Sequence, residues 1–329
     1  MAFRRVISGL LFLCVFFWVP QNQARADSLS RKIDSFVTNS VDAKYAASVL
    51  VAVDEGVILQ KGYDWTDSTR KHPTSEKTLF NVASITKSFT AIAIFLLKDQ
   101  GRLRLEDTLP VFFKDVPKEK QSITVRQLLL HTSGLKQNYA TDGITGRDLA
   151  VAAILKDDLK FAPGSDFSYS NENYELLAAI IEVVSGASYE MFVRENILAK
   201  AKMNDTRFWA EAAGLGTQTV AQKNRELQPN NLRRNWGYIG SGGLYMTVGD
   251  LYRWFTSLKT GEILSPKSLS LMWEPQKALS ETDVAFGWFV SNPNGGQKEI
   301  WTRGTEDWGH SGARSSSCRQ IPASSVINP

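Results

Sequence analysis

The sequence predicts an α/β fold of the α+β type, in which a mainly antiparallel sheet from both termini is flanked by helices and carries an inserted all-helical domain. Three observations predict this fold. Strand-like runs stand near both ends of the chain, helix-like runs fill its middle, and its 329 residues are 43% hydrophobic and 22% charged. Such a chain is long and apolar enough to bury a core. Strands on both sides of a helical middle favour one sheet with an insertion.

The strand-like runs come in two groups. Near the start, residues 47–53 and 57–61 are rich in β-branched side chains and flank the tight turn Asp54-Glu55-Gly56, which predicts a hairpin. Near the end, residues 285–291 and 299–302 are strand-like again. One sheet that contains both groups brings the two halves of the chain together.

A helix is predicted over residues 85–100. Its large apolar side chains recur at steps of three and four, which places them on one face, and Gly101 follows as a C-cap. Ser84, directly before the helix, is a candidate N-cap. A polar amphipathic stretch covers residues 29–40, and three helical patterns fill the middle of the chain: residues 124–130, 146–156 and 172–185.

These patterns divide the chain into two domains. Residues 27–102 and 236–329 form the predicted sheet-containing α/β domain, and residues 103–235 form the predicted all-helical insertion. Residues 1–26 precede both domains as a predicted signal peptide.

The first 26 residues read as an export signal. Arg4 and Arg5 precede an apolar run over residues 6–19, and Ala24-Arg25-Ala26 forms a small-x-small cleavage site before Asp27. A membrane anchor is the alternative, but about 14 apolar residues fall short of the roughly 20 that a spanning helix needs. We therefore expect cleavage, no stable membrane span afterwards, and a periplasmic or secreted protein.

The charges and the rare residue types narrow the function classes. The chain has 38 Lys and Arg against 34 Asp and Glu, and the predicted signal holds three of the cations, so the remainder is almost neutral. A nucleic-acid partner would require a surplus of cations on one face. With three histidines, and with Cys318 as the single cysteine after cleavage, a zinc site and an internal disulfide are both disfavoured. We expect no metal, no cofactor and no nucleic-acid partner.

The motif S-x-x-K can carry nucleophilic chemistry, because it places a hydroxyl and an amine one helical turn apart on the same face. A lysine in a partly dry pocket loses its proton more easily and can take the proton of the serine during attack on a carbonyl. Of three such pairs, Ser84 and Lys87 start the strongly apolar helix. The other two pairs read as solvated surface and as a loop: Ser68/Lys71 and Ser133/Lys136.

Other interpretations of Ser84 remain open from the residues alone. Helix capping is one alternative to catalysis. A Ser-His-Asp triad is another, although no G-x-S-x-G elbow precedes a serine that opens a helix.

Two further motifs are candidates for the same chemistry. In Tyr169-Ser170-Asn171, before a predicted helix, the phenol can transfer protons and the amide can hold a substrate carbonyl, or Asn171 simply caps the helix. In His310-Ser311-Gly312, the glycine allows close approach of a substrate backbone and the histidine suits a carboxylate.

In their order and spacing, three motifs resemble the signature elements of the serine β-lactamase and penicillin-binding-protein superfamily: Ser84-Ile85-Thr86-Lys87, Tyr169-Ser170-Asn171 and His310-Ser311-Gly312. Four longer segments are similar to the branch that holds class C β-lactamases, D-alanyl-D-alanine carboxypeptidases and related esterases: FNVASITK at 80–87, LLLHTSGL at 128–135, FAPGSDFSYSN at 161–171 and SGGLYMTVGDL at 241–251. The resemblance covers about residues 47–312.

The resemblance implies roles for the residues of the first two motifs. Ser84 would be the acylated nucleophile and Lys87 its proton acceptor. Tyr169 would act in general acid and base transfer, and Asn171 would orient the substrate amide. The implied reaction is acyl transfer in two steps, in which an ester forms on Ser84 and water then releases it.

The third motif departs from the class C pattern. His310, followed by Gly312, stands where class C β-lactamases usually have the Lys of K-T-G, and a His-x-G variant is similar to certain D-Ala-D-Ala peptidases and esterases. A histidine is largely neutral at pH 7, which weakens a specific β-lactamase assignment. The backbone N–H groups of Ser84 and Ala313 would form the oxyanion hole.

The end of the chain also departs from the family. The resemblance implies a strand pair and a long C-terminal helix after the third motif, whereas residues 313–329 show neither strand alternation nor a helical stripe. We therefore expect a truncated or frame-shifted end. The strand of the third motif would then lie at an uncovered edge of the sheet.

The predicted function is that of an exported serine hydrolase, β-lactamase-like or D-Ala-D-Ala carboxypeptidase-like, which forms an acyl-enzyme. Its substrate would be a β-lactam, a peptidoglycan peptide or a small ester. Two alternatives stand beside it: an esterase without β-lactam activity, and a truncated remnant that binds ligands without catalysis.

Overall fold

The structure is a computed structural model that describes residues 12–17, 23–40, 46–53, 56–67, 69–216, 219–221, 234–278, 282–292, 298–305 and 313–317. Its strands are β1 (Phe12–Phe17), β2 (Ala47–Val53), β3 (Gly56–Tyr63), β4 (Phe80–Asn81), β5 (Arg207–Phe208), β6 (Leu244–Met246), β7 (Lys277–Ala278), β8 (Asp283–Ala285), β9 (Trp288–Ser291), β10 (Glu299–Arg303) and β11 (Ala313–Ser317). They form an eight-stranded sheet, in the order β3-β2-β1-β11-β10-β9-β8-β7, and a small sheet, in the order β4-β6-β5. All pairs except those of β1 are antiparallel, which confirms the predicted sheet class.

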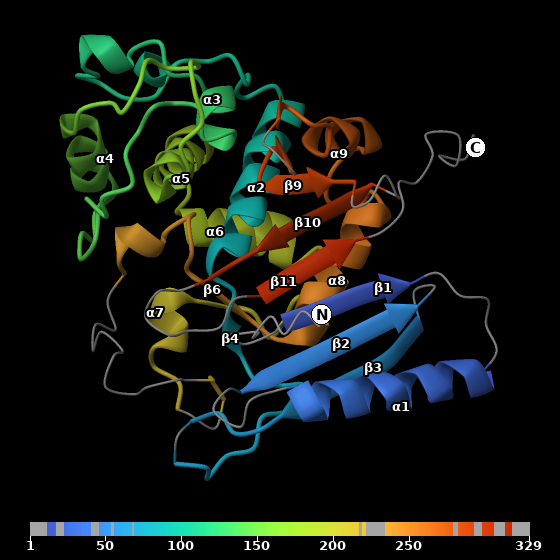
Figure 1. Ribbon diagram of the computed structural model, residues 1–329. Helices are drawn as coiled ribbons and strands as arrows, with labels where there is room; N and C mark the ends of the chain where they lie inside the picture. Colours follow the sequence, from blue (N-terminus) through green and yellow to red (C-terminus); the bar gives the residue numbers. More distant parts are fainter. Residues whose placement is uncertain are drawn as a thin grey trace, which may run out of the picture.

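The α-helices surround this sheet and fill the middle of the chain. They are α1 (Gln23–Ser40), α2 (Thr86–Asp99), α3 (Val125–Leu129), α4 (Arg147–Lys156), α5 (Asn171–Ser185), α6 (Tyr189–Val193), α7 (Trp209–Ala212), α8 (Val248–Lys259) and α9 (Pro266–Met272). Shorter turns are η1 (Ala83–Ile85), η2 (Leu109–Val111), η3 (Lys118–Lys120), η4 (Arg194–Leu198) and η6 (Trp236–Tyr238). Figure 1 shows α3, α4 and α5 gathered on one side of the molecule, the large sheet on the other, and α2 between them.

The predicted N-terminal hairpin is confirmed by β2 and β3, which pair in antiparallel register with an irregularity between Val51 and Ala52. Alternate side chains of β2 face opposite sides of the sheet, as the period of a strand requires. Val49 packs with Val37 of α1, and Leu50 belongs to the main core. Helix α1 therefore covers one face of the hairpin, below the sheet in Figure 1.

Strand β1 lies between β2 and β11 and pairs with both in parallel. Its residues come from the predicted export signal. The expectation that residues 313–317 lack a strand is wrong, because β11 pairs with β10 on one side and with β1 on the other. The edge of β11 that was expected to be uncovered is therefore paired with β1. Residues 313–317, ARSSS, have a weak strand pattern, but backbone pairing with two neighbouring strands outweighs it.

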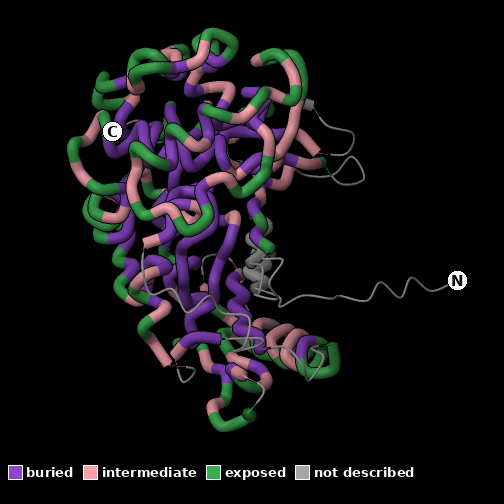
Figure 2. The backbone as a smooth tube through the Cα atoms, turned by 90° about the vertical axis from the view of Figure 1, so that its left-hand side faces the viewer, coloured by how far each residue is buried: buried purple, intermediate pink, exposed green. Residues whose placement is uncertain are grey.

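The core of the molecule is centred on two helices. Every residue from Thr86 to Leu97 of α2 is buried, and α5 is buried over most of its length. Trp254 of α8 stacks between Phe89 of α2 and Trp288 of β9, with ring centroids 4.3 and 5.1 Å apart. Figure 2 shows buried residues running through the centre of the molecule and exposed residues in its surface loops. This packing holds α2 rigidly against the sheet.

The predicted helices of the middle segment are present, with ends that follow their sequence signals. Thr124 and Gln127 form a capping box at the start of α3, and Gly186 ends α5 at a φ of 75°. The segment 103–235 is not entirely helical, because β5 lies within it and pairs with β6. The prediction of an all-helical insertion is wrong at this point, where two residues add an edge to the small sheet.

The predicted strand over residues 285–291 is also corrected. It is a tight hairpin of β8 and β9, which turns at Phe286 and Gly287. Gly287 has a φ of 79°, and a side chain there would lie 2.7 Å from the Cβ of Ala91 in α2. The glycine allows both the turn and the close approach to the helix.

Within the described ranges, no single helix has the length and hydropathy of a membrane span, and one sharply bent pair of helices, Asn171–Ser185 with Tyr189–Leu198, passes that test by length and composition alone.

Candidate active site

Ser84 lies in the short turn η1, between β4 and α2. The preceding residue, Ala83, has a φ of 46°, a left-handed conformation that costs a residue with a Cβ about 1 kcal/mol. The side chain of Asn81 accepts the N–H of Ala83 at 2.6 Å, and Val82 donates to the carbonyl of Leu244. These bonds hold the strained turn to the small sheet. Strained backbone of this kind is typical of functional sites, and here it determines the position of Ser84.

The alternative role of Ser84 as a helix cap is not found. Neither η1 nor α2 has a side-chain cap at its start. The half-buried Ser84 hydroxyl instead contacts two other functional groups, which are 3.1 Å away on Lys87 and 2.7 Å away on Tyr169.

Lys87 lies one turn further along, with 3% of its surface exposed. Its Nζ donates to Ser84 Oγ at 3.1 Å, to Asn171 Oδ1 at 2.7 Å and to the carbonyl of Ser241 at 2.7 Å. Three acceptors match the three N–H bonds of an ammonium group. The site is therefore complementary to a lysine that has accepted the proton of Ser84.

Tyr169 and Asn171 approach this pair from the segment that leads into α5. The Tyr169 hydroxyl donates to Ser84 Oγ at 2.7 Å, and the Tyr169 ring lies 5.0 Å from Lys87 Nζ. Asn171 is the first residue of α5, but its side chain forms no cap and accepts from Lys87. The structure thus brings together the four residues that the first two motifs single out.

His131 supports Tyr169 from behind. Their rings stack with centroids 4.3 Å apart, and His131 Nδ1 accepts the backbone N–H of Ser170 at 3.3 Å. Burial and, after it, the charge of Lys87 hold the pKa of His131 well below its usual range. The imidazole is therefore neutral at pH 7 and acts as an acceptor at Nδ1.

The two other S-x-x-K pairs do not form comparable sites. Ser133 is completely buried, and its hydroxyl donates to Asn173 at 2.5 Å, so this pair lies in a packed loop. Ser68 lies outside the described residues, and its partner Lys71 is exposed.

The third motif is only partly placed. His310 and Gly312 lie outside the described residues, whereas Ala313 begins β11. β11 and β10 both contact η1, so the backbone of Ala313 starts a strand that lies next to the turn of Ser84. A side chain at Gly304, just after β10, would lie 2.8 Å from the backbone nitrogen of Ser84, so the chain passes close to the nucleophile there.

A small cavity of about 20 Å³ adjoins the nucleophile. Its wall includes Ser84, Lys87 and Tyr169, together with the exposed Arg303 at the end of β10. That volume accommodates about one water molecule.

In the part of the chain that is described, no three His, Cys, Asp or Glu side chains are grouped to hold a metal ion.

Two contributors to the site were not identified from the sequence. The carbonyl of Ser241 and the ring of His131 both lie in segments whose only signal in the sequence is their similarity to the family. A backbone carbonyl has no side-chain signal. The role of His131 depends on stacking between residues 38 positions apart, which no local pattern shows.

Comparison with known proteins agrees with this geometry. The family model described as "Beta-lactamase" matches residues 33–327. Protein flp of Staphylococcus aureus (strain MW2) is 29% identical over 284 residues, which cover 80% of this chain and 56% of that protein. Penicillin-binding protein 4* of Bacillus subtilis (strain 168) is 28% identical over 282 residues, which cover 78% of this chain and 62% of that protein. The chain thus spans somewhat more than half the length of these relatives.

A solved structure shows the same fold. The octameric penicillin-binding protein homologue from Pyrococcus abyssi superposes with a TM-score of 0.70 at 25% identity, over 87% of this chain and 68% of that one. The match of the family model to most of the chain, together with the Ser84, Lys87 and Tyr169 arrangement, leads to one conclusion. The chain belongs to the β-lactamase family, within the superfamily of serine β-lactamases and penicillin-binding proteins.

Proposed function

We propose that this protein is an exported serine hydrolase that forms an acyl-enzyme on Ser84. One observation carries the proposal: the Ser84 hydroxyl lies 3.1 Å from the amine of Lys87 and 2.7 Å from the phenol of Tyr169. Both distances are within the reach of proton transfer. A hydroxyl between two such groups can lose its proton to one and return a proton to a leaving group through the other.

The proposed reaction has two steps. Neutral Lys87 accepts the proton of Ser84 as Oγ attacks the acyl carbonyl, and the three acceptors around Nζ stabilise the resulting ammonium. The tetrahedral intermediate collapses when its leaving nitrogen or oxygen takes a proton from Tyr169 or Lys87. Water then attacks the ester and gives a proton to this pair, which passes it to Ser84 Oγ as the acid leaves.

The surroundings of Lys87 stabilise the positive charge that its amine carries after the proton transfer. Lys87 is buried and lies 5.0 and 5.7 Å from the rings of Tyr169 and Tyr174. His131, behind Tyr169, is neutral, so it adds no positive charge.

Arg303 favours substrates that carry a carboxylate. Arg303 is exposed, and it is one of the residues that line the cavity beside Ser84. A guanidinium is always charged and binds a carboxylate by charge-assisted hydrogen bonds. We therefore propose a β-lactam or a peptidoglycan peptide as the substrate class, with a neutral small ester as the competing candidate.

Acylation by two reagents tests the proposal. The full chain is incubated with a fluorescent penicillin and, separately, with p-nitrophenyl acetate, and the adduct is located and followed over time by mass spectrometry. Ser84→Ala should remove all labelling. Ser133→Ala is the matched control, because it alters another S-x-x-K serine that makes no contact with Lys87, and it should leave labelling unchanged.

Each result assigns the chain differently. A penicilloyl adduct that persists supports a peptidase, fast loss of the adduct supports a β-lactamase, and turnover of the ester alone supports an esterase. Labelling that survives Ser84→Ala, or no adduct with either reagent, contradicts the proposal.

A further inference from the structure

The residue between Tyr169 and Asn171 is held on three sides. Ser170 is completely buried, and its N–H donates to His131. Its hydroxyl lies 2.8 Å from Oε2 of Glu172 and 3.1 Å from the carbonyl of Lys136. Tyr169 and Asn171 flank Ser170 and provide the contacts to Ser84 and Lys87, so whatever holds Ser170 also determines where those two side chains lie.

Glu172 is the acidic partner in this arrangement, and only 1% of its surface is exposed. Its Oε1 accepts two backbone N–H groups, from Asn138 at 2.9 Å and from Tyr139 at 2.8 Å. Its Oε2 accepts the hydroxyl of Ser170. One buried carboxylate therefore joins the start of α5 to the loop of residues 136–139.

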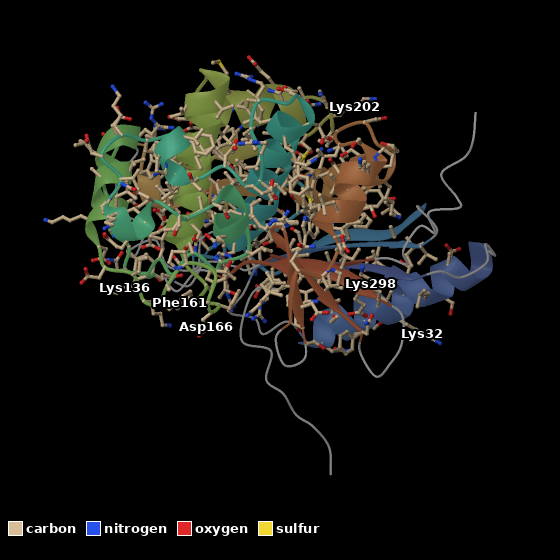
Figure 3. The ribbon with its side chains drawn as sticks, turned by 90° about the horizontal axis from the view of Figure 1, so that it is seen from above. Lys32, Lys136, Phe161, Asp166, Lys202 and Lys298 are labelled. Atoms are coloured by element: carbon tan, nitrogen blue, oxygen red, sulfur yellow. The ribbon has the colours of Figure 1, made fainter. Side chains whose placement is uncertain are left out.

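The other hydrogen bonds of that loop lie mostly at its surface: the side chain of Asn138 donates to Asp157, and that of Gln137 donates to the Tyr139 hydroxyl. Gln137, Asn138 and Tyr139 are all exposed, and Tyr139 has a φ of 57°, which a residue with a side chain adopts at a cost. Figure 3 shows Lys136, at the start of the loop, on the edge of the molecule near Phe161 and Asp166. Water can satisfy the N–H groups of a surface loop, whereas an acceptor in the interior ties the loop to one position. Glu172 is that acceptor for Asn138 and Tyr139.

We propose that Glu172 is a positioning residue for acylation of Ser84: its carboxylate locks the loop of residues 136–139 to Ser170 and thereby holds Tyr169 and Asn171 in place. The inference rests on the proposed function. The carboxylate of Glu172 bonds to Ser170 and to the loop, and not to the side chains that surround the reacting atoms, so it acts through Ser170 and the loop.

Two substitutions at this position separate the hydrogen bonds from the charge. Glu172→Ala removes the acceptor of both loop N–H groups and the partner of Ser170. Glu172→Gln keeps its amide oxygen for Asn138 and Tyr139, while its amide nitrogen donates to the Ser170 hydroxyl, whose own proton goes to the carbonyl of Lys136. Glutamine therefore preserves the lock, and alanine does not.

Glu182→Ala is the matched control. Glu182 lies on the same helix, is 9% exposed, accepts the backbone N–H of Tyr189 at 2.9 Å and pairs with Arg234. Glu182→Ala therefore also removes a buried carboxylate that accepts a backbone N–H. The partners of Glu182 are Tyr189 and Arg234, and not Ser170 or the loop. This variant measures how much a general loss of stability in α5 lowers the acylation rate constant.

The experiment measures two quantities in each full-length protein. The first is the acylation rate constant and the apparent dissociation constant for the fluorescent penicillin. The second is the hydrogen-exchange protection of the Asn138 and Tyr139 amides, which does not depend on activity.

For Glu172→Ala we expect the acylation rate constant to fall roughly 10- to 100-fold with a smaller change in the dissociation constant, because misplaced groups slow the chemical step. Protection of both amides should be lost. Glu172→Gln and Glu182→Ala should keep the rate constant within about threefold of the wild type, a margin well below the effect of misplaced catalytic groups.

Other outcomes overturn the inference. If wild-type protein is acylated and Glu172→Ala reacts at the same rate, or loses rate only as much as Glu182→Ala does, Glu172 has no positioning role. If Glu172→Ala slows acylation while both amides stay protected, the lock is not the reason and the proposal is wrong. Absence of acylation in the wild type instead contradicts the proposed function, whatever the amides show.

Discussion

Arg303 connects the geometry of the site to the choice of substrate. Its guanidinium lies 5.6 Å from the ring of Trp301, and Arg303 is one of the residues that line the cavity beside Ser84 and Lys87. A cation at this place does not take part in the proton transfers, which involve Lys87 and Tyr169. Its contribution is therefore to binding, and it should differ between charged and neutral substrates.

Arg303→Gln is expected to slow acylation by a penicillin about tenfold, which corresponds to the loss of one charge-assisted hydrogen bond to the carboxylate. Reaction with p-nitrophenyl acetate, which has no carboxylate, should be unchanged. The two second-order rate constants check this prediction. Equal losses for both reagents would show that Arg303 supports the fold of the site and does not select the substrate.

Glu175 shows how burial makes stability depend on pH. It is 2% exposed, and burial, followed by the negative charge of Glu172, raises its pKa well above the usual range. The Thr141 hydroxyl lies 2.6 Å from its carboxyl group. The folded protein therefore keeps a proton that the unfolded chain loses above about pH 4.5, the ordinary value for the group.

Because the folded state binds more protons, this group makes the free energy of unfolding fall as pH rises, by up to about 1.4 kcal/mol per pH unit. Glu175→Gln removes that slope and keeps an acceptor for Thr141. Urea unfolding at pH 5, 6, 7 and 8 should show the variant gaining stability relative to the wild type as pH increases. Parallel curves for the two proteins would contradict the assignment of the proton to Glu175.

At the scale of elements, the contact between the β8–β9 turn and α2 places Lys87. A Cβ at Gly287 would lie 2.7 Å from Ala91 Cβ and 3.2 Å from the carbonyl oxygen of Lys87. Helix α2 is packed on all sides and has little freedom to move away. The turn therefore acts as a spacer between the sheet and the helix that carries the catalytic lysine.

Gly287→Ala should lower the free energy of unfolding by about 2–3 kcal/mol, the sum of backbone strain and overpacking. Gly101→Ala is its control, because Gly101 has a φ of 70° but open space around it, so strain alone should cost about 1 kcal/mol. Chemical denaturation measures both. Similar losses in the two variants would mean that the contact with α2 is not a tight one.

The elements also show what sequence patterns can and cannot predict. The β2–β3 hairpin, α2 and α5 were predictable, because each has a strong apolar period and a clear end at a turn or a glycine. The break at Gly287 was missed, because the apolar run continues through it and only packing against Ala91 requires a turn. β5 was missed because a two-residue strand has no period.

For the site, the sequence motifs predicted which side chains meet, since Ser84 and Lys87 are local and Tyr169 and Asn171 lie two residues apart. They could not predict the carbonyl of Ser241 or the loop contact of Glu172, because each depends on a segment distant in the chain. Such contacts follow from tertiary packing, and no short motif encodes them.

At the scale of the whole molecule, the large sheet depends on β1. This strand pairs in parallel with β2 from Cys14 to Phe17 and with β11 from Phe12 to Cys14. Without it, β2 and β11 would face each other with unpaired N–H and C=O groups. The strand therefore completes the layer on which the turn of Ser84 rests.

A chain that starts at Asp27 is expected to unfold at a temperature several degrees below that of the full chain and to aggregate more readily, because two strand edges lose their partner. Both forms can be produced without export and compared by calorimetry and light scattering. Identical melting temperatures would show that β1 adds nothing to the stability of the sheet.

We propose that residues 12–17 have two alternative roles that exclude each other, as strand β1 of the large sheet and as part of an export signal. A stretch of chain seated between β2 and β11 is hidden from the machinery that recognises and cuts a leader, and a leader that has been cut away leaves a gap in the layer. Secretion would thus compete with folding for the same six residues. Slow folding before translocation would favour the cleaved form, and rapid folding would trap the uncleaved form inside the cell.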